Sequence, residues 1–346
     1  MSDGPESPIA FALGRVVGGG TLDADTTASA VAEVIGGRAD PVATGGLLAA
    51  LATRGETVDE LVGAARTLRS VMRPTPVTRA GVLDTCGTGG DGASTFNIST
   101  ATAIVVSACG VPVAKHGNHS VSSKSGSADV LLELGVKIDL EPEAVGACVD
   151  EIGLGFCFAR VAHAAMRHAA PVRRALGVRT LFNQIGPLSN PAGAEFQLLG
   201  AWSDAVAARL AGALGRLGTT RAAVVCGDGA FDEVALSGVT KAFLVEGEDE
   251  IREVSFRPED FGVAAADPST LAVGSPAESA AVINGVLAGD PGPARDIVVA
   301  NAAVALMVAR GTFDRPADAA AEAAEAITDG RAADRLEALV EATARG

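Results

Sequence analysis

The chain is poor in aromatic residues and rich in negative charge, and both features exclude classes of function. Of its 346 residues only 3% are aromatic, with no Tyr and a single Trp, Trp202. Proteins that bind single-stranded nucleic acid stack bases on aromatic side chains, and this chain offers few of them. Its formal net charge of −15 also disfavours nucleic-acid backbones and anionic membranes, which attract basic surfaces. The sequence therefore predicts a protein that binds neither nucleic acid nor membranes.

Disulfide frameworks, signal peptides and membrane spans are also missing from the pattern. The five cysteines are scattered without any C-x-x-C spacing, which is typical of reduced, mostly buried thiols in a cytosolic protein. Residues 1–8 are polar and acidic and lack the apolar core of a signal peptide. No stretch long enough to span a bilayer is free of both glycine and charge. We expect a soluble, cytoplasmic protein.

The first 72 residues show apolar residues at helical spacing and no strand pattern. Glycines separate the helices, and Thr57 with Glu60 has the spacing of a capping box. Pro74 and Pro76 then end the helical pattern, because proline cannot continue a helix. We predict a helical domain over residues 1–73, completed by a helical segment near 162–190 that includes one amphipathic helix over 161–175. The other predicted helices of this domain cover residues 9–17, 28–35, 42–51 and 58–72.

From residue 82 onward, short β-branched runs alternate with helical stretches. This alternation predicts a mainly parallel sheet with helices on both faces. The predicted strands are 82–85, 111–114, 136–138, 155–158, 197–201 and 222–226. The predicted helices are 97–109, 128–134, 142–152, 204–217, 277–287, 296–310, 317–327 and 332–344. The fold class is therefore α/β, with a small all-helical N-terminal domain and a larger α/β domain over residues 74–346.

Two long segments contain no carboxylate, although the chain carries 42 acidic residues. They are residues 92–128 and 152–194, and all four histidines lie inside them. Chance combined with alanine-rich burial is one explanation. Binding of a strongly anionic ligand is the other, because a carboxylate beside such a ligand would repel it. The cationic residues in the two segments are Lys115, Lys124, Arg160, Arg167, Arg173, Arg174 and Arg179.

The first motif is Cys86-Gly-Thr-Gly-Gly-Asp-Gly92, which lies between a predicted strand and a predicted helix. No acidic residue for a ribose diol follows before Asp129, so a dinucleotide fold is disfavoured. The Gly-Lys-Ser/Thr end of a Walker A loop is also missing. A phosphate or pyrophosphate cradle remains, because glycine amides and a helix N-terminus both favour anions. Ordinary turn glycines with a cap at Asn97 are the alternative.

Two further motifs fit the same ligand. Residues 115–127 form a donor-rich segment with five serines and two lysines between a strand and a helix, which suits phosphates better than it suits a linker. Asp232 and Glu233 follow the predicted 222–226 strand. Alone they could be an exposed surface pair. Next to a polyphosphate site they are hard oxygen ligands suited to Mg²⁺.

Together these motifs resemble the anthranilate phosphoribosyltransferase family over nearly the whole chain. The resemblance rests on Gly87-Thr-Gly-Gly-Asp91, Asn97-Ile-Ser-Thr100, Lys115-His-Gly-Asn118, the 122–129 segment and Asp232-Glu233. It also includes His163-x-x-Met-x-His-x-x-Pro-Val-Arg173, the 176–183 segment and Gly186-Pro-Leu-x-Asn-Pro191. It implies a nucleoside-phosphorylase-like transferase fold, a homodimer joined through the helical domains, Mg²⁺ as cofactor, and phosphoribosyl pyrophosphate and anthranilate as substrates.

The resemblance also implies roles for individual residues, and it assigns no catalytic acid or base. Residues implied to bind phosphoribosyl pyrophosphate are Gly87, Gly90, Asp91, Thr95, Asn97, Ser99, Thr100, Lys115, Ser123 and Ser127. Residues implied to bind anthranilate are Gly87, Asn118, His163, Arg173 and Gly186, with Arg173 facing the carboxylate. Residues implied to bind the metal are Ser99, Asp232 and Glu233.

Two positions depart from the family pattern. His119 stands where the family usually has Arg, and Ala164 stands where it commonly has Pro. Both departures fall close to the acceptor motifs. A same-fold transferase with another aromatic or pyrimidine acceptor is therefore an alternative function. A non-catalytic nucleic-acid-binding paralogue is a second alternative, although such a protein is expected to lose the acidic pair and gain basic charge.

Overall fold

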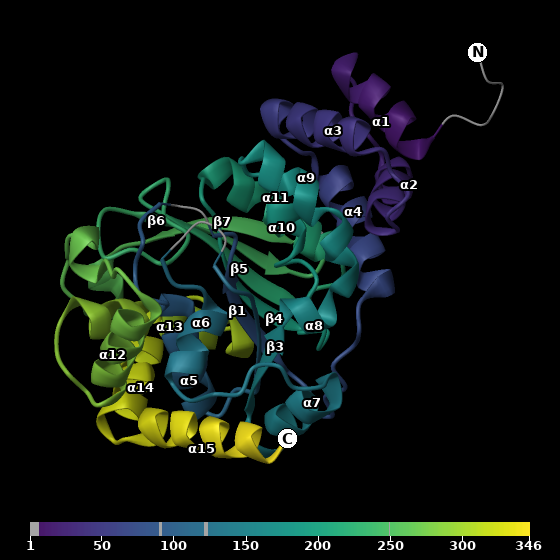
Figure 1. Ribbon diagram of the computed structural model, residues 1–346. Helices are drawn as coiled ribbons and strands as arrows, with labels where there is room; N and C mark the ends of the chain where they lie inside the picture. Colours follow the sequence, from purple (N-terminus) through teal and green to yellow (C-terminus); the bar gives the residue numbers. More distant parts are fainter. Residues whose placement is uncertain (1–6, 90–91, 121–123, 249) are drawn as a thin grey trace, which may run out of the picture. The chain divides into compact units, whose positions relative to one another are not determined.

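The protein is described by a computed structural model that covers residues 7–89, 92–120, 124–248 and 250–346. The chain divides into two compact units, coloured by sequence in Figure 1. The first unit combines Met1–Arg73 with His163–Ser189, and the second combines Pro74–Ala162 with Asn190–Gly346. The first unit therefore includes a segment from the middle of the chain, His163–Ser189.

Within its described residues, the first unit contains helices and no strand. Its N-terminal part holds α1 (Pro8–Val17), α2 (Ala24–Ile35), α3 (Pro41–Arg54) and α4 (Val58–Val71), and its later part holds the 3₁₀ helix η1 (Ala164–His168), α9 (Ala170–Leu176) and α10 (Leu181–Ile185). The predicted capping box of Thr57 and Glu60 is present at the start of α4. The fully buried Glu60 carboxylate also accepts the Leu22 N–H at 3.0 Å and forms an ion pair with Arg54. These bonds join the α3–α4 turn to the segment before α2.

The single helix predicted over residues 161–175 is wrong. The segment contains three short pieces, namely the end of α8 (Ala159–Ala162), η1 and α9. His163 separates the first two pieces, with φ −119° and ψ 51°, outside the helical region. Pro171 lies in the first turn of α9, where a missing N–H is tolerated, whereas in a continuous helix its ring would clash with the preceding turn. The chain therefore breaks at His163 and starts a new helix at Pro171.

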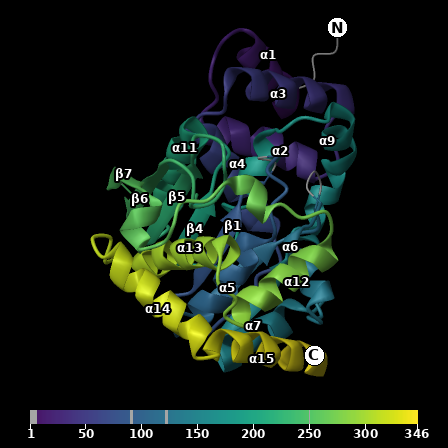
Figure 2. The ribbon, with the colours of Figure 1, turned by 90° about the vertical axis from the view of Figure 1, so that its left-hand side faces the viewer.

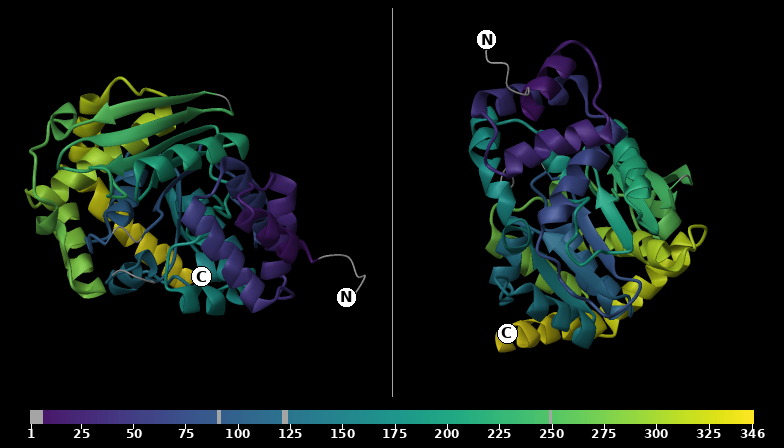
Figure 3. Two further views of the ribbon diagram at one scale, coloured as in Figure 1. Left: turned by 90° about the horizontal axis from the view of Figure 1, so that it is seen from above. Right: turned by 90° about the vertical axis from the view of Figure 1, so that its right-hand side faces the viewer.

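The second unit contains a seven-stranded sheet in the order β3-β2-β1-β4-β5-β6-β7. The strands are β1 (Leu83–Gly87), β2 (Val113–Gly117), β3 (Leu154–Phe158), β4 (Phe196–Gly200), β5 (Arg221–Gly227), β6 (Thr240–Glu246) and β7 (Ile251–Phe256). The first five are parallel, and β6 and β7 continue the sheet as antiparallel strands. The predicted α/β class with a mainly parallel sheet is confirmed. The left view of Figure 3 shows the green edge strands side by side.

One predicted strand is wrong and two strands were missed. Residues 136–138 form no strand, although Val136 and Ile138 are buried in the core. They follow the left-handed Gly135 and pack as a loop without a hydrogen-bonded neighbour strand. The antiparallel strands β6 and β7 were not predicted.

Helices cover both faces of the sheet, as expected. On one face, α5 (Ile98–Ala108) and α13 (Pro293–Arg310) pack on the main apolar cluster, below the sheet in Figure 1. On the other face, α7 (Pro142–Ile152) packs on β3, and α11 (Asp204–Arg216) packs on β5 and β6. Figure 2 shows α14 and α15 following α13. The remaining helices of this unit are α6 (Ser127–Glu133), α8 (Ala159–Ala162), η2 (Pro258–Phe261), η3 (Pro268–Leu271), α12 (Pro276–Leu287), α14 (Pro316–Thr328) and α15 (Arg331–Arg345).

Between β1 and β4, the chain changes the side of the sheet on which it adds strands. The chain runs from β1 to β2 and β3 on one side, and then returns to place β4 on the other side of β1. In open parallel sheets, ligands bind outside the carboxyl ends of the strands at such a point. The loops after Gly87 and Gly200 are therefore where a site is expected.

Within the described residues, no helix has the length and apolar character needed to cross a membrane.

Candidate functional site

Two glycines end the neighbouring strands β1 and β4 in register with each other, and Asp232 lies against both. The Gly89 N–H donates to the Asp232 carboxylate at 2.8 Å, and the Thr88 N–H donates to the Gly200 carbonyl at 2.9 Å. A Cβ built on Gly200 would lie 1.6 Å from the Asp232 carbonyl oxygen, and one on Gly87 would lie 2.6 Å from its carboxylate. Residues 228–239, between β5 and β6, carry Asp232 and Glu233 and are called the acidic loop below. Only glycine leaves room here for this loop to approach the strand ends.

Glu233 lies at the N-terminus of α5. Its carboxylate accepts the Ser99 N–H at 3.1 Å, and the Thr85 hydroxyl donates to the Ser99 carbonyl at 2.9 Å. The first turn of a helix carries partial positive charge, which favours a carboxylate. Asp232 and Glu233 therefore reach two consecutive parts of the same segment, the glycine loop and the helix that follows it. Thr100, in the same turn, is buried.

Lys115 is the central residue of β2 and exposes only 3% of its surface. Its ammonium donates to the Thr85 carbonyl at 2.5 Å and to the Ser99 hydroxyl at 3.2 Å. Burial lowers the pKa of Lys115, and the nearby carboxylates of Asp84 and Glu233 oppose that shift. Burial likewise raises the pKa of Asp84, which accepts the His116 N–H at 2.9 Å. A buried cation thus lies beside the helix turn that Glu233 contacts.

The described residues at the two ends of the second loop, between β2 and α6, contact each other. The Asn118 N–H donates to the Ser127 hydroxyl at 3.2 Å, and the Asn118 carbonyl accepts the Ala128 N–H at 3.1 Å. A Cβ on Gly126 would lie 2.2 Å from the Ser120 nitrogen, so a side chain there would open the loop. Asn118 and Ser127 are therefore held at adjacent positions at the base of the loop.

Asn97 connects the two loops. It was predicted as an anion ligand, with a helix cap as the alternative, and it makes no side-chain cap bond. Its side-chain oxygen accepts the hydroxyls of Ser125 at 2.7 Å and Ser279 at 2.8 Å, and its amide donates to the Ser125 carbonyl at 3.1 Å. Asn97 occupies the N-cap position of α5, but its side chain makes no capping bond there. Asn97 instead joins the first loop to the second loop and to α12.

His119, at the position that departs from the family pattern, contacts Asp129 at 2.5 Å. Its ring also meets the Phe158 ring edge-on, with centroids 5.2 Å apart. Burial alone would raise the pKa of Asp129, but N–H groups of Ser120 and Gly126 and the His119 ring lower it. His119 therefore closes the second loop through a carboxylate of α6.

Three predicted acceptor residues belong to the first unit. His163 is 5% exposed, and burial lowers its pKa to about 4. The Arg173 guanidinium lies 5.8 Å from the centre of the Phe182 ring, and burial lowers its pKa. Gly186 follows the last residue of α10. The described residues of this unit thus supply an arginine stacked on an aromatic ring.

The structure brings four of the ten residues predicted for phosphoribosyl pyrophosphate close to Asp232 and Glu233. Gly87, Ser99, Thr100 and Lys115 lie with the acidic pair, and Thr95 forms an isolated β-bridge with Ala272 at the far end of the first loop. Gly90, Asp91 and Ser123 lie outside the described residues, so their placement stays a prediction.

Sequence reasoning missed the residues that support the site from other elements. Ser279 of α12 contacts Asn97, and Asn301 of α13 contacts Val234 in the acidic loop. Asn301 carried a usable signal, because it is the one polar residue in the apolar run 297–308. A buried polar group in such a run needs a hydrogen-bond partner.

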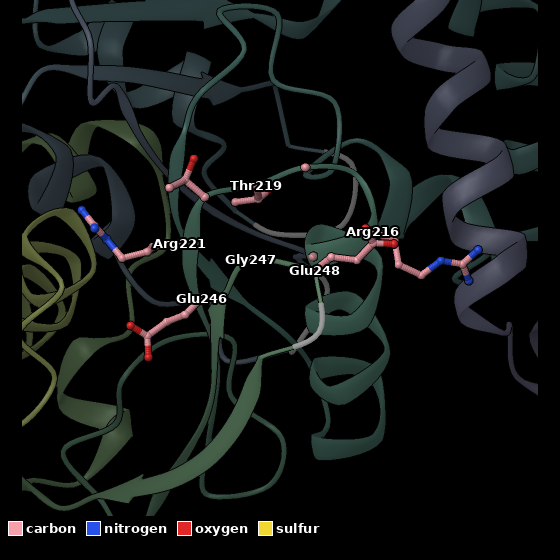
Figure 4. Close-up of a pocket in the computed structure, with 9 residues that line it drawn as sticks. Arg216, Thr219, Arg221, Glu246, Gly247 and Glu248 are labelled. Carbon is pink, nitrogen blue, oxygen red and sulfur yellow. The ribbon is translucent and has the colours of Figure 1, made fainter.

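A cavity of about 460 Å³ lies elsewhere in the second unit, at the start of β5 and the end of β6 (Figure 4). Because β5 ends at Gly227, this cavity is at the opposite end of the sheet from the glycine loop. Arg221 points away from it and donates to the carbonyls of Val308 and Ala309. None of the predicted site residues lines it. The lining residues are Gly215, Arg216, Gly218, Thr219, Thr220, Arg221, Glu246, Gly247 and Glu248.

Comparisons with known proteins agree with this geometry. The chain matches the model of the glycosyl transferase family a/b domain over residues 79–333 and that of the helical bundle domain over residues 12–72. It is 48% identical to the anthranilate phosphoribosyltransferase of Desulfatibacillum aliphaticivorans over 332 residues, covering 96% of this chain and 97% of that protein. It is 50% identical to that of Thioalkalivibrio sulfidiphilus over 312 residues, covering 90% and 91%.

Solved structures show the same fold. The crystal structure of the Thermus thermophilus anthranilate phosphoribosyltransferase has a TM-score of 0.90 at 41% identity, covering 96% of this chain and 99% of that one. The enzyme from Saccharomyces cerevisiae, in complex with phosphoribosyl pyrophosphate and Mg, also reaches 0.90, at 24% identity and 99% coverage of both chains. On the sequence motifs, the sheet topology and these identities, the chain belongs to the anthranilate phosphoribosyltransferase family.

Proposed function

We propose that this enzyme transfers the phosphoribosyl group of phosphoribosyl pyrophosphate to the amino group of anthranilate, releasing pyrophosphate, as a step of tryptophan biosynthesis. The observation that carries the proposal is the approach of Asp232 and Glu233 to the glycine loop and to the first turn of α5. This arrangement joins hard carboxylate oxygens to backbone amides at the switch point of the sheet. A metal-bound diphosphate requires both kinds of group.

We propose that the diphosphate and ribose phosphate are bound by the two glycine- and serine-rich loops. Gly87 allows the backbone to approach the ligand, while Ser99 and Thr100 supply hydroxyls from the first turn of α5. Lys115 adds a positive charge at the same turn. The further proposed ligands are Gly90, Asp91, Thr95, Asn97, Ser123 and Ser127.

The donor set also fits Mg²⁺. This ion usually binds one or two carboxylates together with substrate phosphates and water. Asp232 and Glu233 are adjacent, and their carboxylates accept the N–H groups of Gly89 and Ser99 in the proposed phosphate-binding segment. The bond from the Ser99 N–H brings this serine next to Glu233. We propose that these three residues hold the ion. When bound, Mg²⁺ supplies positive charge that neutralises the departing pyrophosphate.

We propose that anthranilate is bound by Gly87, Asn118, His163, Arg173 and Gly186. Arg173 is the proposed partner of the carboxylate, because a guanidinium matches a carboxylate with two parallel hydrogen bonds. His163, with a pKa of about 4, is neutral at physiological pH and adds no charge near the acceptor. The proposed ligands include no dedicated base, so catalysis rests on positioning both substrates and on electrostatic stabilisation of the leaving group.

The direct test follows anthranilate fluorescence as phosphoribosyl pyrophosphate and Mg²⁺ are added. Consumption of anthranilate that requires both additions supports the proposal, and its absence contradicts it. A panel of other aromatic acids and pyrimidine bases tests the alternative acceptors. His119 and Ala164 motivate this panel, since both depart from the family pattern near the acceptor motifs. A better substrate than anthranilate in that panel would replace the proposed acceptor.

We also propose a homodimer in a reducing compartment such as the cytoplasm. Support for the dimer comes from the first unit, where Phe11, Val17 and Val42 expose 47%, 71% and 82% of their surface. Support for the compartment comes from the five cysteines, all of them free thiols. Sedimentation equilibrium would test the dimer.

Neutralising the acidic pair should weaken the response to magnesium. In the double variant Asp232→Asn, Glu233→Gln, the backbone contacts to Gly89 and Ser99 can be kept, but the two negative charges are lost. We expect the Mg²⁺ concentration for half-maximal activity to rise at least tenfold, since each charged ligand contributes on the order of 1.5–3 kcal/mol. Steady-state rates across a Mg²⁺ series measure this. An unchanged metal profile would remove both residues as ligands.

Replacing Arg173 by alanine should affect one substrate far more than the other. We expect the KM for anthranilate to rise roughly 30-fold or more, because a charged hydrogen-bonded pair lost from a binding site costs on the order of 2–5 kcal/mol. The KM for phosphoribosyl pyrophosphate should change little. The matched control is Arg174→Ala, at the exposed neighbouring position. Equal effects of Arg173→Ala on both substrates would refute the carboxylate role.

A further inference from the structure

Asn301 is a fully buried amide in an otherwise apolar stretch of α13. Its exposure is 0%, and the other residues of the 297–308 run are aliphatic or Met. Such a helix could pack with alanine or valine at this position, as it does at its neighbours. A polar side chain there is stabilising only if its hydrogen bonds are made.

Those bonds are directed at the acidic loop. The Val234 N–H donates to Asn301 Oδ1 at 2.9 Å, and Asn301 Nδ2 donates to the Val234 carbonyl at 3.1 Å. Asn301 Nδ2 also donates to the carbonyl of Ile297 in its own helix, at 2.9 Å. The amide therefore binds both backbone groups of Val234, as a neighbouring strand would, and its other bond fixes the side chain on the helix.

Val234 directly follows the two carboxylates, so this contact fixes the C-terminal side of the acidic pair. The next residue, Ala235, donates its N–H to the Thr240 hydroxyl at 2.9 Å. On the N-terminal side, the Gly227 N–H donates to the Phe231 carbonyl at 2.7 Å. Asp232 and Glu233 are thus held between two anchored backbone segments. Their carboxylates can reach Gly89 and Ser99 only while the backbone keeps this path.

We propose that Asn301 is a positioning residue that fixes the backbone after Asp232 and Glu233, so that both carboxylates are preorganised for the Mg²⁺ complex of phosphoribosyl pyrophosphate. The inference rests on the proposed function, because it assumes that this pair binds the metal. Asn301 contacts neither substrate nor metal. It acts through the main chain of Val234, from an element 67 residues further along the chain.

The test measures ligand binding instead of turnover. Calorimetric titration of phosphoribosyl pyrophosphate into the full-length protein, at a series of Mg²⁺ concentrations, gives the concentration at which binding is half restored. We expect Asn301→Ala to raise that concentration at least tenfold, the usual cost of removing a group that orients a metal ligand. Saturating Mg²⁺ should bring binding back towards the wild-type level.

The matched control is Ser107→Ala. Ser107 is 1% exposed, lies at the end of α5 away from the acidic loop, and donates to the Gly153 carbonyl at 2.8 Å. The variant Ser107→Ala loses a buried hydrogen bond in the same unit, so it shows the effect of a general loss of stability. Ser107→Ala should leave the Mg²⁺ dependence unchanged. If Asn301→Ala matches the wild type, or if both variants shift equally, the positioning role is overturned.

A second variant decides the question if Asn301→Ala does not fold. Thr240→Val keeps the side-chain shape and removes only the acceptor of the Ala235 N–H. It should raise the half-restoring Mg²⁺ concentration in the same direction by a smaller factor, and an unchanged value would count against the proposal. Failure of the wild-type protein to bind phosphoribosyl pyrophosphate with Mg²⁺ would overturn the proposed function as well. If the wild type binds, and the variants need the same Mg²⁺ concentration as the wild type, only the role of Asn301 is overturned.

Discussion

Replacing Gly200 by alanine is expected to lower kcat/KM for phosphoribosyl pyrophosphate about 100-fold. The added methyl would lie 1.6 Å from the Asp232 carbonyl oxygen and 2.4 Å from its carbonyl carbon. Both are backbone atoms, so the acidic loop must move by roughly 1 Å or more. A displacement of about 1 Å in a positioned group typically costs about 100-fold in rate. Steady-state kinetics with Mg²⁺ held at saturation measures the loss.

The variant should nevertheless remain folded, so that the loss of activity does not reflect unfolding. Crowding of one methyl in a packed region costs on the order of 1–3 kcal/mol, which a protein of this size tolerates. Gly14→Ala is the control, since a Cβ on Gly14 meets nothing within 4 Å and the residue lies inside α1. It should keep full activity. Wild-type kinetics for Gly200→Ala would show that the acidic loop is not confined by the strand ends.

Gly200 also shows what the sequence could and could not predict. The glycine loop after β1 was predicted, because strand, glycines and helix follow one another within a short stretch of chain. The need for glycine at position 200 was not predicted, because it arises from contact with Asp232 in another loop. Likewise, the Gly89 and Asp232 pair is separated by 143 positions, and no local spacing encodes it.

The edge of the sheet was missed for a different physical reason. In β7 only Phe256 is buried, and the strand carries Arg252 and Glu253 on its exposed surface. Charged residues are typical of edge strands, where they discourage pairing with another chain. Such a strand has little of the apolar alternation by which the inner strands were predicted. Its pairing with β6 depends on backbone hydrogen bonds, which the side-chain pattern does not record.

The free energy of unfolding should decrease as the pH is lowered, in a range of pH set by His163. Burial lowers the pKa of this residue to about 4 from its usual value of 6.5, and a hydrogen bond to the Ser189 backbone only partly opposes the shift. Between these two values the unfolded chain binds a proton that the folded chain does not. The stability that His163 contributes is therefore fully present above its pKa in the unfolded chain. It is lost as the pH falls towards its pKa in the folded protein.

The expected size is about 2 kcal/mol lost between about pH 7 and pH 5, because each unit of pKa difference corresponds to about 1.4 kcal/mol. Urea unfolding followed by circular dichroism at the two pH values measures it. His163→Leu cannot take up the proton, so its free energy of unfolding should change by about 2 kcal/mol less over the same interval. If His163→Leu and the wild type lose equal stability, the buried imidazole is not the group that titrates, and the proposal of a neutral His163 in the anthranilate site is overturned.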